Sequence, residues 1–120
     1  MRFLTGKKRE IENNKLKTKA DDTFVYIIEV NDNSDNELLS CSFSGDYRES
    51  GDIISYSPDT SSFTYELNSS IEDPTELLDY VSQMKSYMYS MPDDEIVLVN
   101  ADKLILKDLS DGENVEYFRE

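Results

Sequence analysis

The sequence predicts an α+β domain in which an antiparallel sheet of six to seven strands packs against one long amphipathic helix. Short segments that alternate apolar and polar residues recur along the chain, separated by clusters of Asn, Asp, Ser and Gly, as expected of antiparallel strands. One stretch, from Asp73 to Met91, has helical periodicity instead. The strands before it indicate a meander, and those after it indicate further hairpins.

Composition places the chain among folded domains. Leu, Ile, Val and Phe make up 30 of 120 residues, which exceeds the range typical of disorder, and the length suits one domain. No apolar run approaches the roughly eighteen residues of a membrane span, and no signal-peptide core is recognisable. We therefore expect a cytoplasmic protein. The single cysteine, Cys41, lies in an alternating segment, which favours a small buried hydrophobe over a nucleophile.

Charge is distributed unevenly along the chain. Residues 1–19 hold seven basic and two acidic side chains, a net charge of +5, whereas residues 20–120 hold five basic and 24 acidic ones, a net charge of −19. A surface this negative repels nucleic acid and anionic membranes and attracts basic proteins. We therefore expect a basic protein partner, no direct nucleic-acid binding by the body and no membrane association. Solubility alone is the competing explanation for the acidity.

Residues 1–22 are predicted to form a basic, flexible N-terminal arm that precedes a single acidic domain at residues 23–120. The arm is polar and offers few apolar anchors, which is typical of a disordered terminus. Basic arms can bind nucleic acid, but this one is tethered to a body of opposite charge. That charge contrast favours folding back onto its own domain or contact with a neighbouring copy in a homo-oligomer.

The first strands are predicted from their patterning. Residues 23–30 are apolar on both faces, as in the middle of a sheet. Residues 31–37 are predicted to be a hairpin loop, although oxygen-bearing side chains recur there as in a calcium loop. An EF-hand would need Gly at the sixth place and Glu at the twelfth, where this chain has Asn36 and Ser42. Residues 38–44 alternate cleanly and predict a strand with one buried face.

The remaining strands follow from the turn residues between them. Before the helix we expect a polar loop at Gly45 to Gly51, a strand at 52–57, a turn around Pro58 and Asp59, and a strand at 62–68. After the helix we expect strands at 96–99, 103–107 and 114–118. Residues 96–99 are apolar on both faces and suggest a central strand. In the last hairpin turn, Gly112 would supply the positive φ.

The helix from Asp73 to Met91 has a clear start. Asp73 is the expected N-cap, Pro74 suits the first helical position, and Glu76 follows the cap by three residues. The end is expected at Met91 because Pro92 disfavours helix in the preceding residue. The apolar stripe that should face the core contains Leu77, Val81, Met84, Met88 and Met91. Tyr80 and Tyr87 fall on its border, where tyrosines can be half buried.

Catalytic chemistry has little support. The chain has no histidine, one cysteine and four glycines, which removes histidine-dependent triads, zinc clusters and phosphate-cradling loops. Neighbouring carboxylates at 93–95 and 108–113 leave open a glycosidase-like pair or a magnesium site. With 26 acidic residues, however, such pairs arise by chance. We therefore expect a non-enzymatic protein with no cofactor and no metal.

A partner-binding surface is predicted on and after the helix. Glu72, Glu76 and Asp79 are spaced by four and three residues, which places neighbours roughly 5 to 6 Å apart on a helix, a scale comparable with phosphates along a nucleic acid. Aromatic side chains beside them would anchor the contact. The predicted residues are Glu72, Glu76, Asp79, Tyr80, Gln83, Tyr87, Asp93, Asp94 and Glu95. The alternative is that these acids form only the solvated face of a surface helix.

Two functions are consistent with these features. In the first, the domain inhibits or neutralises a basic protein, for example one that binds nucleic acid, by imitating phosphates. Phage-encoded inhibitors and immunity proteins share this composition, although no motif links the chain to them. In the second, it is a structural or assembly subunit, for example of a phage particle, whose basic arm contacts the acidic body of the next copy. Self-association that depends on the arm would distinguish the second function from the first.

Overall fold

Eight strands and one helix follow one another along the computed structural model, which describes residues 2–9, 12–18, 21–32, 34 and 36–119. Within these ranges, side chains are described for residues 15–118. The strands are β1 (Arg2–Arg9), β2 (Glu12–Thr18), β3 (Thr23–Asn31), β4 (Glu37–Ser50), β5 (Ile53–Leu67), β6 (Asp94–Val99), β7 (Lys103–Asp108) and β8 (Asn114–Arg119). Helix α1 (Thr75–Tyr89) connects β5 to β6.

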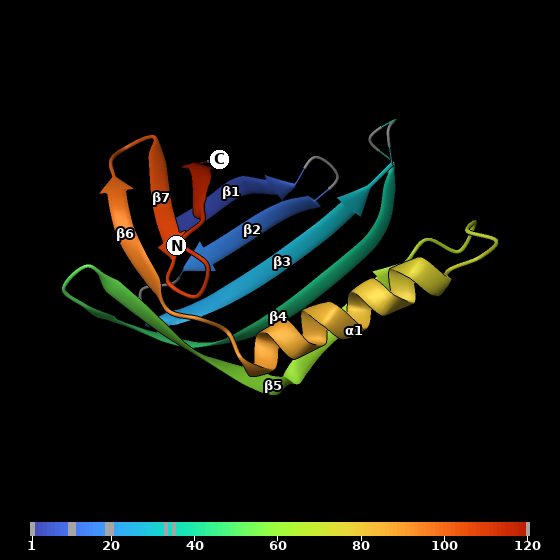
Figure 1. Ribbon diagram of the computed structural model, residues 1–120, viewed down its shortest axis with the longest axis horizontal. Helices are drawn as coiled ribbons and strands as arrows, with labels where there is room; N and C mark the ends of the chain where they lie inside the picture. The colour runs from blue at the N-terminus through green and yellow to red at the C-terminus, as the bar shows by residue number, and fades with distance from the viewer. Residues whose placement is uncertain (1, 10–11, 19–20, 33, 35, 120) are drawn as a thin grey trace.

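Each strand pairs antiparallel with the next, and β1 also pairs with β8, so that the sheet closes into a barrel (Figure 1). The predicted antiparallel sheet with one helix packed on it is therefore confirmed. Three finer features of the prediction differ from the structure. The described part of the chain has eight strands rather than six to seven, and their closure into a barrel was not predicted. The helix has 15 residues, which is shorter than the expected span from 73 to 91.

The segment expected to be an arm contributes two strands to the barrel. β2 pairs with β3 from Glu12↔Val30 to Thr18↔Phe24. Leu16 points into the core with only 2% of its surface exposed, while the ammonium group of Lys15 lies 2.9 Å from the Glu29 carboxylate. The basic segment thus folds back onto its own domain. One apolar residue in the right register, Leu16, is enough to pack β2 against the core, because only one face of the strand is buried.

The hairpin of β4 and β5 has longer strands than predicted, of 14 and 15 residues. The expected loop at 45–51 is part of β4, and the chain turns only at Gly51, which has the positive φ of 61°. Gly45 serves a different purpose, because a Cβ there would lie 2.3 Å from the Ser57 carbonyl oxygen. The expected turn near Pro58 is present as an irregularity inside β5, where pairing jumps from Ser44↔Asp59 to Ser42↔Thr64.

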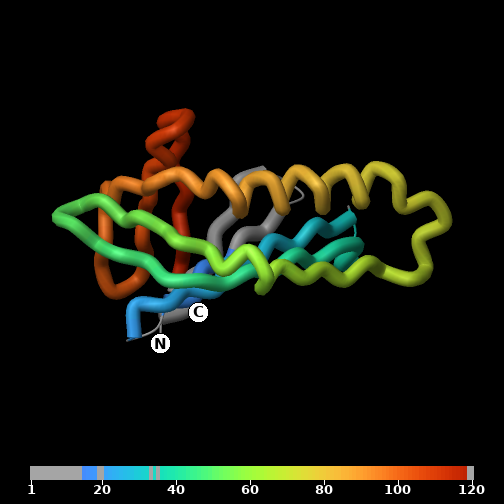
Figure 2. Tube along the Cα trace, turned by 90° about the horizontal axis from the view of Figure 1, so that it is seen from below, coloured from blue at the N-terminus to red at the C-terminus, as the bar shows by residue number. Residues whose placement is uncertain are grey.

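β5 and β6 stay together for only two residue pairs, Ile53↔Glu95 and Ile54↔Asp94. Beyond this point β5 continues to Leu67 without β6, and α1 packs against β5 and β4 instead (Figure 2). The helix therefore takes over part of the barrel wall. β6 is less buried than its apolar sequence predicted, and Val97 is 50% exposed.

No helix in the described part of the chain is long and apolar enough to cross a membrane.

The core fills the barrel interior in two clusters. The larger cluster combines Leu16 of β2, residues of β3 to β5, Met88 of α1 and residues of β7 and β8. The smaller cluster joins Val30, Leu39 and Cys41 to Val81 of α1. Cys41 is 1% exposed, so its prediction as a small buried hydrophobe is confirmed. The two buried helical residues, Val81 and Met88, lie on the predicted apolar stripe.

Candidate functional site

The start of α1 is stabilised by hydrogen bonds to Asp73, the residue expected at the N-cap. Asp73 Oδ1 accepts hydrogen bonds from the Thr75 backbone N–H at 3.1 Å and from the Thr75 hydroxyl at 2.6 Å. These two bonds lower the pKa of Asp73. Pro74, rather than Asp73, occupies the N-cap position, and its carbonyl oxygen accepts from the Leu78 N–H at 2.8 Å. Asp73 therefore still ties the first turn to the preceding loop, one residue further out than expected.

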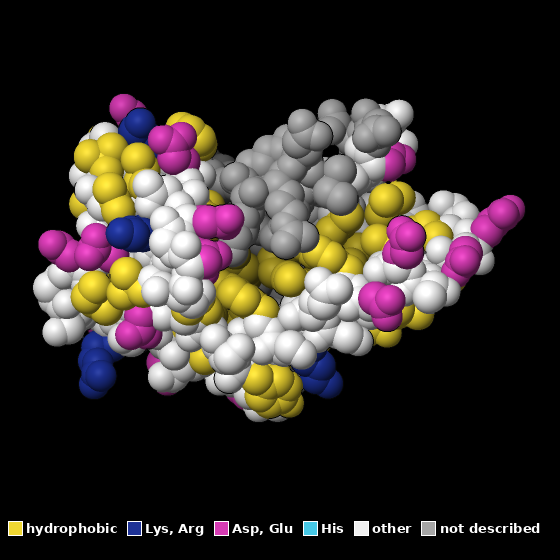
Figure 3. Space-filling view, viewed as in Figure 1, with side chains coloured by type: hydrophobic (Ala, Val, Ile, Leu, Met, Phe, Trp, Pro, Cys, Tyr) yellow, Lys and Arg dark blue, Asp and Glu magenta, His cyan; other side chains and the backbone are white. Residues whose placement is uncertain are grey.

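The outer face of α1 is acidic toward its N-terminal end. Glu72, Glu76, Asp79 and Gln83 are all exposed, and Figure 3 shows acidic side chains gathered over this end of the helix, at the right of the view. Among the described residues, no lysine or arginine forms an ion pair with these three acids. The structure therefore brings this part of the predicted surface together and leaves it open to solvent.

The two predicted tyrosine anchors face the core rather than the outside. Tyr80 and Tyr87 are half buried, as expected, and both pack against the hydrophobic core. The Tyr87 ring lies 6.2 Å from that of Tyr26, and burial, together with the nearby Asp94 carboxylate, raises the pKa of its hydroxyl. The apolar groups that α1 presents to solvent are Leu78, 40% exposed, and Tyr89, 64% exposed.

Leu78 and Tyr89 could have been recognised from their spacing. Residues eleven apart on a helix of about 100° per residue lie on nearly the same line, and that line lies roughly 110° around the helix from the centre of the buried stripe. Leu78 precedes Asp79 and lies roughly 100° around the helix from it, whereas Tyr89 is the last residue of α1, thirteen residues or roughly 20 Å from Glu76. The exposed half of the helix thus carries acids at its start and an apolar residue at each end.

The acidic connector does not extend this surface. Asp93 is exposed, but the helix separates it from Glu76 by thirteen helical residues, or roughly 20 Å at 1.5 Å per residue. Asp94 turns the other way, and its Oδ2 accepts a hydrogen bond of 2.7 Å from the Tyr56 hydroxyl. Glu95 is partly buried and pairs with Ile53 and Lys107 in the sheet. The structure therefore separates residues 93–95 from the acids at the start of α1.

The carboxylates near the last hairpin shape its turn. Asp108 is 5% exposed, and its Oδ1 accepts from the Ser110 N–H at 2.8 Å and from the Ser110 hydroxyl at 2.6 Å. Asp111 Oδ1 accepts from the Glu113 N–H at 2.8 Å. Gly112 has the predicted positive φ, 76°. No group of three or more Cys, Asp, Glu or His side chains in the described part of the chain is arranged to hold a metal ion.

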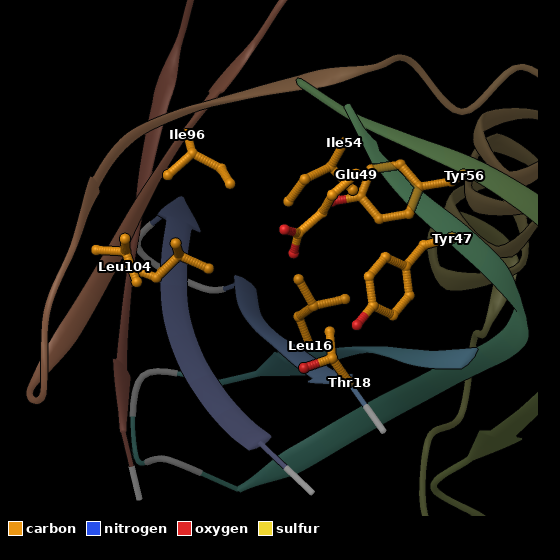
Figure 4. A pocket seen from close by; sticks show the side chains of 9 residues that line it. Leu16, Thr18, Tyr47, Glu49, Ile54, Tyr56, Ile96 and Leu104 are labelled. Carbon is orange, nitrogen blue, oxygen red and sulfur yellow. The ribbon is translucent and has the colours of Figure 1, made fainter. Parts of the chain in front are cut away.

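A cavity inside one end of the barrel was not predicted. Its volume is about 160 Å³, and nine described residues from the five strands β2, β4, β5, β6 and β7 line it (Figure 4). The lining residues are Leu16, Thr18, Tyr47, Glu49, Ile54, Tyr56, Ile96, Val99 and Leu104. Figure 4 shows the Glu49 carboxylate directed into the space between the strands. The cavity therefore combines apolar walls with one carboxylate, two phenol groups and the hydroxyl of Thr18.

Glu49 reaches the cavity because the alternation of β4 continues through the expected loop. Phe43 and Cys41 face inward, and after Gly45 the same face continues with Tyr47 and Glu49, which pair with Tyr56 and Ile54 of β5. The polarity of residues 45–51 concealed this pattern in the sequence. A period of two that runs on through Tyr47 and Glu49 was the signal that could have revealed them.

No protein-family model matches this chain, and no curated protein is recognisably similar to it in sequence. Its function is therefore inferred from the geometry of these two regions, the outer face of α1 and the cavity at the end of the barrel.

Proposed function

We propose that the protein acts without catalysis by binding a basic protein through the outer face of α1, as an inhibitor or immunity-type protein would. The observation that supports this proposal is the group of exposed acids at the start of α1, Glu72, Glu76 and Asp79. The helix also exposes two apolar side chains, Leu78 next to these acids and Tyr89 at its other end. Interfaces commonly combine a buried aromatic or aliphatic anchor with a charged rim. Both components are present on one helix here.

Charge would govern how the partner arrives. The chain has a net charge of −14, so a basic protein is attracted before contact and associates faster at low salt. Glu76 and Asp79 stand one turn apart on the helix, a spacing comparable with that of successive phosphates. A nucleic-acid-binding protein whose basic site engages them is thereby blocked from its own ligand.

Tyr89 and Leu78 take the role first assigned to Tyr80 and Tyr87. An exposed aromatic ring can enter a pocket on the partner without disturbing the barrel, whereas Tyr80 and Tyr87 are packed against the core. We therefore revise the proposed surface to Glu72, Glu76, Leu78 and Asp79 at the start of α1, with Gln83 at its edge. Tyr89 is a second apolar contact at the other end of the helix, roughly 20 Å from Glu76.

The alternative function, an assembly subunit that uses its basic N-terminal segment, requires a different arrangement of that segment. β1 pairs with β2 and β8 of the same chain, so the segment is built into the barrel rather than extending from it as a free arm. We therefore keep the assembly subunit as the second candidate.

A pull-down from lysate of the native host, with matched variants, tests the proposal. The helix variant Glu72→Gln/Glu76→Gln/Asp79→Asn removes three charges from the proposed surface. The control variant Asp52→Asn/Asp102→Asn/Glu113→Gln removes three exposed charges from hairpin turns. We expect a basic partner that the wild type and the control retain at low salt and that the helix variant loses.

The same experiment separates a specific surface from general acidity. Equal loss with both triple variants would mean that net charge alone captures the partner, and unchanged capture by the helix variant would place the interface elsewhere. Tyr89→Ala adds a second measure, since removing an interface aromatic typically costs about 2 kcal/mol or more, or roughly thirtyfold in affinity. Recovery of only the protein itself would instead favour the assembly subunit.

A further inference from the structure

The cavity at the end of the barrel has the composition of a small-ligand site. We infer that it binds a small organic ammonium ion with a compact apolar body, the charged end meeting Glu49 and the body lying between Leu16, Ile54 and Leu104. This inference is independent of the proposed protein partner, because the lining residues belong to β2 and β4 to β7 and their ends rather than to α1.

The size of the cavity sets the size of its occupant. At about 160 Å³ it is close to the roughly 150 Å³ of an engineered apolar cavity that accepts benzene in another protein. A ring of six carbons, or a branched aliphatic chain of similar bulk, would therefore fill it. Larger ligands such as fatty acids or nucleotides exceed this space.

Most of the wall is apolar and well ordered by the core. Leu16, Ile54 and Leu104 are 2%, 6% and 6% exposed, so their positions are fixed by their packing in the barrel. Ile96 lies on the same side of the space as Leu104 and faces Ile54 across it (Figure 4). A ligand body entering there would exchange water for hydrocarbon contacts, which is the usual source of affinity in such pockets.

The polar groups of the cavity select for positive charge. Glu49 contributes a carboxylate that points into the space (Figure 4), and none of the nine lining residues is a lysine or arginine. Tyr56 donates its hydroxyl hydrogen to Asp94 at 2.7 Å, which leaves its oxygen only as an acceptor. The hydroxyls of Thr18 and Tyr47 can donate or accept, so the one charged group of the described lining, the Glu49 carboxylate, decides the charge preference. A carboxylate with no lysine or arginine among these nine residues disfavours a carboxylate or phosphate ligand and favours an ammonium group.

Glu49 and Val99 also mark the entrance. Both are exposed, Val99 by 49%, whereas the apolar residues deeper in the cavity are buried. A ligand can therefore enter with its apolar body first and leave its ammonium group beside the Glu49 carboxylate, where the group keeps part of its hydration. No strand pairing of the barrel has to break for this entry.

Titration of the full chain with 2-phenylethylamine, monitored by methyl NMR, tests the inference. The neutral analogue 2-phenylethanol and the anion phenylacetate have the same ring and serve as matched ligands. We expect the amine to bind best and phenylacetate not to bind. The methyl signals of Leu16, Ile54 and Leu104 should shift on saturation, while those of the exposed Leu78 should stay in place.

Charge removal at one position then assigns the ammonium contact. Glu49→Gln should weaken amine binding by about tenfold or more, as expected for loss of a charged hydrogen bond, and should change 2-phenylethanol binding by less than about twofold. Glu66→Gln removes an exposed charge from β5 that does not line the cavity and should leave amine affinity within about twofold. Equal loss in both variants would overturn the assignment and indicate general attraction of cations.

Filling the cavity provides a readout that does not depend on Glu49. Ile96→Phe places extra bulk in the space and should abolish binding of both the amine and the alcohol, with folding checked by the dispersion of the NMR signals. If that variant fails to fold, the methyl shifts of the wild type decide the location. Amine binding without shifts at Leu16, Ile54 and Leu104, or no binding of the amine at all, would refute the proposed site.

Discussion

The hydroxyl of Tyr56 donates a hydrogen bond of 2.7 Å to the carboxylate of Asp94, at the point where β5 and β6 part. The last backbone pair between these strands is Ile54↔Asp94, so the side-chain bond adds a further link just where the ladder ends. It lies beside the cavity, which Tyr56 lines. The bond therefore supports the junction of β5, β6 and the chain that arrives from α1.

Tyr56→Phe should destabilise the protein. The substitution keeps the ring but leaves the partly buried Asp94 carboxylate without this donor, which typically costs about 1.5 to 3 kcal/mol. Urea unfolding at neutral pH measures the change. Tyr65→Phe is the matched control, because Tyr65 lies on the same strand and is 49% exposed; its effect should stay within about 0.5 kcal/mol. Equal stability of the two variants would show that the bond contributes little.

Stability should fall in alkaline solution because two phenols are held neutral. Burial, followed by the effect of Asp94, raises the pKa of both Tyr56 and Tyr87. The unfolded chain loses these protons above about pH 10, whereas the folded chain keeps them. The stabilisation is therefore complete below pH 10 and is lost as pH rises further, by about 1.4 kcal/mol per pH unit for each tyrosine.

Unfolding free energies measured between pH 9 and 12 test this expectation. The double variant Tyr56→Phe/Tyr87→Phe should show a shallower decline above pH 10 than the wild type, although it starts from a lower stability. Substituting two exposed tyrosines, Tyr65 and Tyr89, should leave the slope unchanged. Parallel curves for the wild type and the buried double variant would contradict the assignment.

Local patterning predicted most strands but not their closure. The alternation at 38–44, the positive φ of Gly112 and the helix starting near Asp73 were all predictable because each depends on neighbours in sequence. The pairing of Leu4 with Arg119 joins residues at opposite ends of the chain, and nothing in either segment specifies the other. The two N-terminal strands were missed for the same reason, since a polar strand becomes stable only once a closed barrel supplies both neighbours.

The candidate sites also differ in whether sequence neighbours or distant strand pairing determines them. The acids of α1 could be placed from helical spacing, because the buried stripe fixes which face looks outward. The inward direction of Asp94 depends instead on where β5 leaves β6, and that of Glu49 depends on the continuation of β4 through Gly45. Gly45 suggested a loop because glycine is common in turns, whereas the structure requires it for the close approach of Pro58.

The two glycines of the β4 and β5 hairpin should therefore respond differently to alanine. In Gly45→Ala the new Cβ would meet the Ser57 carbonyl oxygen at 2.3 Å and the Pro58 Cα at 2.6 Å. Backbone must then move, and a cost of about 3 kcal/mol is typical of the upper range for overpacking. Gly51→Ala has open space but a φ of 61°, a strain of about 1 kcal/mol. Thermal unfolding should rank the variants in this order, and a reversed order would contradict the role given to Gly45.

Cys41 should be almost unreactive until the barrel unfolds. Its side chain is 1% exposed, and burial raises the pKa of its thiol to about 11, so the reactive thiolate is both scarce and covered. At pH 8 a disulfide reagent should modify the native protein at least about a thousandfold more slowly than the urea-unfolded chain, because access requires opening of the core.

The control variant Cys41→Val/Ser82→Cys places the thiol on the exposed face of α1 and should react at nearly the unfolded rate. Native Cys41 reacting within tenfold of the unfolded chain would mean that this part of the barrel opens readily and that α1 does not seal it.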